Sequence, residues 1–86
     1  MMDKKLERVL GWVNRVRVTR LKLKPLKRLP KGVQEVGSLC VIARALPSVV
    51  GHRFGVFGSV HVREPQYVSN FIAAFDDNEY PKLVQQ

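Results

Sequence analysis

Apolar residues near the start of the chain recur at the spacing of an amphipathic helix. They follow the i, i+3, i+4, i+7 pattern over residues 3–16. These positions are Leu6, Val9, Leu10 and Val13. Trp12 lies beside this stripe, where it either widens the core face or makes a cation–π contact with Arg8 or Arg15.

Two further segments carry the same helical spacing. The first covers residues 39–46, where Ser38 is suited to cap the N-terminus and Pro47 prevents continuation. The second begins at Pro65, a residue favoured in the first helical turn, and ends near residues 76–78. Its apolar positions are Val68, Phe71, Ile72 and Phe75. We therefore expect three helices, followed by a tail at residues 80–84 that folds back on the body.

Two regions show a two-residue period instead. From residue 15 onward apolar residues alternate with cations, which predicts a basic strand or arm over residues 15–31. The alternating apolar residues are Val16, Val18, Leu21 and Leu23. Residues 49–63 hold three glycines among aromatic and β-branched residues, which predicts a hairpin or a bulged strand. The sequence thus predicts a small α+β fold, one domain over residues 1–86, with about three helices and a short antiparallel sheet or hairpin.

Positive charge is concentrated in the first third of the chain. Residues 1–31 hold eleven Lys and Arg against two acids, whereas residues 32–86 hold four against five, so the net charge of +8 comes from the first part. Such an asymmetry points to an anionic partner or a tail. Residues 15–31 alone contain eight cations and no acid. These eight are the candidate residues for binding nucleic acid or another partner: Arg15, Arg17, Arg20, Lys22, Lys24, Lys27, Arg28 and Lys31.

Three interpretations of this basic stretch stay open. In the first, which we favour, the chain is a non-enzymatic binding module whose cations neutralise nucleic-acid phosphates, with an affinity that falls steeply with salt. In the second, the stretch adds a strand to the sheet edge of a protein partner, and the cations steer the approach to an acidic surface. In the third, the stretch is only a solvated strand face with no partner, and its lysines prevent unwanted pairing at the strand edge. The acidic cluster at Asp76, Asp77 and Glu79 could also neutralise the stretch within the chain.

Several short motifs lie between residues 29 and 83. They are Leu29-Pro30-Lys31-Gly32, Cys40-Val41-Ile42-Ala43-Arg44-Ala45-Leu46, Phe75-Asp76 and Tyr80-Pro81-Lys82-Leu83. In this order they resemble a pattern in small proteins of actinobacteria and actinobacteriophages. The resemblance implies a bacterial or phage origin, and with it the cytoplasm of a bacterial cell. The resemblance implies neither a reaction nor any site residues.

Catalysis and metal binding find little support in the residue types. A nucleophilic Cys40 would need His52 or His61 as its base, with Asp76 behind the histidine, yet this cysteine lies in an apolar run typical of a core. Zinc sites use close-spaced pairs of ligands, and no such pair occurs here. We therefore expect no enzymatic activity, no cofactor and no metal.

The composition also restricts the environment. A single cysteine cannot form an internal disulfide and fits a reducing compartment. The longest apolar run, residues 39–43, is far shorter than the ~20 residues of a membrane helix, and charges at residues 4–8 interrupt any signal-peptide core. We expect no membrane association. A core this small is compatible with a homodimer.

Overall fold

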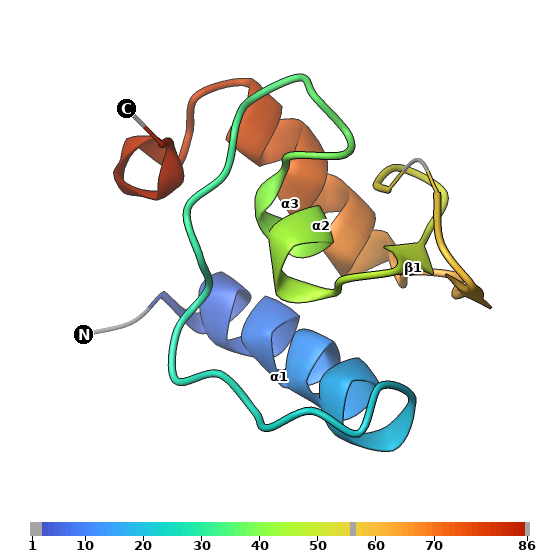
Figure 1. Ribbon diagram of the computed structural model, residues 1–86. Coiled ribbons are helices and arrows are strands. Elements are labelled where there is room, and N and C mark those ends of the chain that lie inside the picture. Colours follow the sequence, from blue (N-terminus) through green and yellow to red (C-terminus); the bar gives the residue numbers. More distant parts are fainter. Residues whose placement is uncertain (1–2, 56, 86) are drawn as a thin grey trace.

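The computed structural model describes residues 3–55 and 57–85 of the chain. Its elements in chain order are α1 (Lys4–Thr19), α2 (Val41–Ala45), β1 (Val49–Val50), β2 (Val60–His61), α3 (Gln66–Asp76) and the 3-10 helix η1 (Pro81–Leu83). Helices α1 and α3 pack against each other, and the short strands lie to one side of the helices (Figure 1). The predicted α+β class with three α-helices is confirmed.

Helix α1 is longer than the apolar spacing suggested. Asp3 caps its start, because its carboxylate accepts a hydrogen bond from the Lys5 backbone N–H (2.7 Å). Its buried residues are Val9, Val13 and Val16, so the apolar stripe of the helix continues into the stretch of alternating residues. The helix runs to Thr19, and the chain then reverses at Lys22, whose φ of 57° lies in the left-handed region.

The strand expected over residues 15–31 is therefore wrong. Residues 15–19 are helical, and residues 20–31 form an irregular segment, which we call the basic segment. In a strand, Val16 and Val18 would share a face. In the helix they point apart, so Val16 is buried while Val18 is 46% exposed.

Helix α2 is a single turn that begins later than expected. Cys40, not Ser38, is its N-cap, and the Cys40 Sγ accepts a hydrogen bond from the Ala43 N–H (3.4 Å). Gly32 lies directly against this helix start, where a Cβ would collide with the backbone of residues 39–41. Only glycine allows so close an approach.

Strands β1 and β2 are parallel, which corrects the expected antiparallel sheet or hairpin. Val49 pairs with Val60, and Val50 pairs with His61. In the connection between the strands Phe54 is buried in the core, and the Gly51 N–H donates to the Phe54 carbonyl (3.0 Å).

Glu64 holds this connection in place. Its buried carboxylate accepts hydrogen bonds from the backbone N–H groups of His52 (2.7 Å) and Arg53 (2.8 Å). Trp12 of α1 meets the connection at Phe54, edge to face, with ring centroids 6.3 Å apart. Trp12 therefore widens the core face, which is the first of its two predicted roles.

Helix α3 agrees with its prediction. Pro65 is its N-cap, and the four apolar positions of its stripe are all buried: Val68, Phe71, Ile72 and Phe75. The tail folds back on the body as expected, because the Gly32 N–H donates to the Leu83 carbonyl (2.8 Å) and the ring of Tyr80 packs on Phe71.

Candidate nucleic-acid interface

The basic segment folds back along α1 (Figure 1), and Asn14 of the helix fastens it there. The Asn14 side-chain amide donates a hydrogen bond to the Leu26 carbonyl (2.9 Å) and accepts one from the Leu26 N–H (2.7 Å). Leu29 is buried, and Leu21 and Leu26 pack against the core. These uncharged groups therefore fix part of the course of the segment.

Arg17 differs from the other candidate cations because its guanidinium is turned toward the body. Its Nε donates to the Lys24 carbonyl (2.9 Å), and its Nη1 donates to the Ala45 carbonyl at the end of α2 (2.7 Å). These bonds join α1, the basic segment and α2. The structure thus gives Arg17 a positioning role within the surface.

The other seven candidate cations are all exposed: Arg15, Arg20, Lys22, Lys24, Lys27, Arg28 and Lys31. The cations of the basic segment lie along α1, because Lys24 and Leu26 of the segment lie against Arg17 and Asn14 of the helix. Within the described residues, none of the hydrogen bonds joins these cations to a carboxylate. Their charges face solvent.

Lys31 lies apart from this group, at the far end of the segment. Its carbonyl accepts a hydrogen bond from Nη1 of Arg44 (3.4 Å), an exposed residue of α2 that also donates to the side chain of Gln85. Sequence reasoning did not single out Arg44, because it stands alone in an apolar run.

Helix α1 adds another arginine that sequence reasoning missed. Arg8 and Arg15 are seven positions apart, which is about two helical turns and places them on the same face. Both are exposed, and Gly11 lies between them, where a Cβ would meet nothing within 4 Å. The face therefore presents two guanidinium groups beside uncovered backbone. The helix expected over residues 3–16 already contained this signal, since both arginines lie within it.

The acidic cluster is placed away from the basic segment. Asp76 accepts a hydrogen bond from the Glu35 backbone N–H (2.8 Å), and Gln34 donates to the Phe75 carbonyl beside it (3.0 Å). Figure 1 shows this end of α3 on the opposite side of the molecule from residues 20–28. Neutralisation of the segment by these acids finds no support in the arrangement.

Cys40 has the environment of a core residue. Burial raises the pKa of its thiol, more than the backbone N–H groups at the start of α2 lower it. The cavity beside it has Glu35, Arg53 and Asp76 in its wall, and no histidine among its described lining residues. In residues 3–55 and 57–85, no group of three or more His, Cys, Asp and Glu side chains could hold a metal ion.

Among the helices that the structure describes, none combines the length and apolar character needed to cross a membrane. Comparisons of the chain with protein-family models, with curated proteins and with solved structures found no match. The chemistry of the surface is therefore the guide to function.

Proposed function

We propose that this chain is a non-enzymatic nucleic-acid-binding module that contacts phosphates through the exposed cations of α1 and the basic segment. One observation carries the proposal: the segment is fastened by Asn14, by leucines and by Arg17, while its own charges are exposed and have no carboxylate partner among the described residues. Cations held in this way neutralise phosphates and release counterions. Because the segment is already ordered, less entropy is lost on binding than for a disordered tail.

The types of side chain favour contact with phosphates over recognition of base sequence. Lysines interact with phosphate as point charges, and phosphate contacts carry no sequence information by themselves. Arg15 and Arg20 are the exposed arginines best suited to a bidentate contact, and Arg8 extends this set along α1. We expect binding with little dependence on sequence.

A second candidate is an acidic protein surface, and exposed apolar residues favour it. Val18 of α1 is 46% exposed and Leu23 of the basic segment is 38% exposed, so both can supply apolar contact to a partner. Strand addition to a sheet edge loses its basis, because residues 20–31 contain no strand. Docking would therefore use the outer face of the segment.

Fluorescence anisotropy with a labelled mixed-sequence duplex and a labelled single strand tests the proposal. We expect binding at low salt that is lost as salt is raised to a moderate concentration. No binding at any salt concentration would contradict it. Capture from a bacterial lysate, with and without nuclease treatment, then shows whether a protein partner is retained directly.

A further inference from the structure

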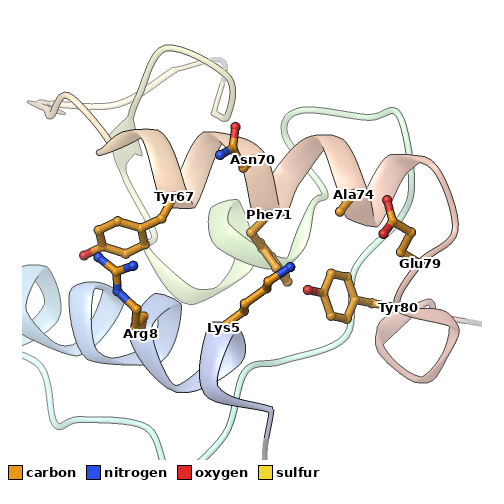
Figure 2. A pocket seen from close by; sticks show the side chains of 8 residues that line it. All are labelled: Lys5, Arg8, Tyr67, Asn70, Phe71, Ala74, Glu79 and Tyr80. Atoms are coloured by element: carbon orange, nitrogen blue, oxygen red, sulfur yellow. The ribbon is translucent and has the colours of Figure 1, made fainter.

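A cavity of about 290 Å³ lies between α1 and α3, beside Tyr80 (Figure 2). Phe71 of α3 contributes an apolar wall and is only 4% exposed, and its ring lies 5.1 Å from the ring of Tyr80 at an angle of 44°. Phe71 is also stacked on Phe75, with centroids 6.3 Å apart, so the core sets its position. Phe71 therefore gives the cavity a fixed wall and the partly exposed Tyr80 gives it an aromatic surface, at a volume near the lower end for small-ligand sites.

Two cations of α1 line the side of the cavity that faces α3. Figure 2 shows the ammonium group of Lys5 reaching toward Phe71 and the hydroxyl of Tyr80. The guanidinium of Arg8 lies over the ring of Tyr67, 4.2 Å from its centroid. A guanidinium carries five N–H donors, so Arg8 can also bind an anion from this position. Within the described residues, no hydrogen bond joins the side chain of Lys5 or Arg8 to a carboxylate, and the Asp3 carboxylate bonds only to the backbone N–H of Lys5.

The opposite end of the cavity is chemically different. Glu79 lies beside Tyr80 there, and an ionised carboxylate can only accept hydrogen bonds. Burial, with smaller contributions from the charges of Asp3 and Glu79, raises the pKa of the Tyr80 phenol, which therefore stays protonated at neutral pH. The cavity thus combines a cationic end, an aromatic wall and an end that accepts hydrogen bonds.

We propose that this cavity binds a guanosine monophosphate unit, with its phosphate at Lys5 and Arg8 and its base against Phe71 and Tyr80. Aromatic side chains stack on any base. Guanine presents two adjacent N–H donors, which one carboxylate can accept as a pair, so Glu79 favours guanine over uracil. The ligand is either a free nucleotide or an unpaired residue of a strand.

In the second case this inference rests on the proposed nucleic-acid function. Arg8 belongs both to the cavity and to the face of α1 that carries Arg15, so a strand bound along that face would pass the cavity entrance. A strand held by Arg8 and Arg15 along that face would then place one unpaired base in the cavity.

Amide NMR shifts of the full chain, titrated separately with five probes, test the inference. The probes are guanosine monophosphate, uridine monophosphate, phenyl phosphate, inorganic phosphate and a short single strand with one guanine. We expect guanosine monophosphate to shift the amide signals of residues 67–71 and 79–80. It should bind about tenfold more tightly than uridine monophosphate. Lys5→Ala should weaken it about tenfold, whereas Lys4→Ala, the exposed neighbour outside the cavity, should leave it unchanged. Glu79→Gln should remove the preference for guanine.

Each outcome separates this inference from the proposed function. No shift at the cavity with any probe overturns the inference, and duplex binding at low salt then still supports the proposed function. Equal binding of phenyl phosphate or inorganic phosphate also overturns it, because the site would then not recognise the base. Cavity shifts with the free nucleotide but no binding of strand or duplex would retain the site and contradict the proposed function.

Discussion

The basic segment and the acidic end of α3 both follow a helix and both carry a cluster of like charges, but they use those charges differently. In the basic segment the fastening groups are the uncharged Asn14 and the leucines, together with Arg17. At the end of α3 a charged group is itself the fastening group, because the Asp76 carboxylate holds the Glu35 N–H. Charge and structure are thus largely separate in the first region and combined in the second.

This difference indicates which charges are available to a partner. A charge that takes no part in holding the chain can be removed without loss of stability, so its loss should be seen only in binding. A charge that holds the backbone should be seen in stability. The substitutions below test that separation, beginning with the largest expected effect.

Reversal of three segment charges should give the largest change. Lys22→Glu, Lys24→Glu and Lys27→Glu together should lower duplex affinity at low salt by at least about a hundredfold, because phosphate contacts are replaced by repulsion. Anisotropy measures the affinity. The matched control carries Arg53→Glu, Arg63→Glu and Lys82→Glu, which change the net charge equally at exposed positions elsewhere.

The control should lose far less affinity than the segment variant. Equal losses in both variants would mean that only the net charge matters, and would contradict a defined surface.

Release of the segment from α1 should have the second largest effect, which is a loss of stability. Asn14→Ala removes both bonds to Leu26, at a cost of about 2 kcal/mol in the free energy of unfolding. Urea denaturation measures this free energy. Duplex affinity should also fall severalfold, because the cations of the segment are no longer held in place. Asn70→Ala is the control, since among the described residues its side chain bonds only to Gln66 at the surface. An equal small effect of both substitutions would show that Asn14 does not fasten the segment.

At the acidic end of α3, substitution should lower stability and leave duplex affinity nearly unchanged. Asp76→Ala should lower the free energy of unfolding by about 1 kcal/mol, since the Glu35 N–H loses its acceptor, and should change duplex affinity less than about twofold. Asp77→Ala removes the same charge from an exposed neighbour, and the stability of this variant should equal that of the original chain. A large rise in affinity specific to Asp76→Ala would indicate that this acid does oppose the basic surface.

The smallest expected effect is at the turn after α1. Lys22→Gly removes one cation and also relieves a positive φ, so the free energy of unfolding should stay level or rise by less than about 1 kcal/mol. Lys24→Gly removes the same charge without that relief, and should cost about 0.5–1 kcal/mol. Thermal unfolding compares the two. A clear loss of stability in Lys22→Gly would mean that the lysine side chain itself helps to hold the turn.

The predictability of the fold from the sequence depended on the range of the contacts involved. Helix α3 was predictable because Pro65 and one apolar stripe both act locally. The two-residue period near residue 16 was misleading, since Val16 also continues the helical stripe of Val9 and Val13. The parallel strand pair was not predictable, because it follows from the burial of Phe54 against distant parts of the core.

The candidate site follows the same rule. The concentration of cations was evident from the sequence, and seven of the eight are exposed. The role of Arg17 was not evident, because its partner at the Ala45 carbonyl lies 28 positions away in the chain. The cavity was equally hidden, since it forms where Lys5 and Arg8 of α1 meet Tyr80 of the tail.

The dependence of duplex affinity on salt tests the central claim most directly. If about six of the exposed cations contact phosphates, the logarithm of the association constant should fall with the logarithm of salt concentration at a slope near −5. The variant with three reversed segment charges should show a much shallower slope or no binding. A slope near zero for the original chain, or no binding at low salt, would contradict the account.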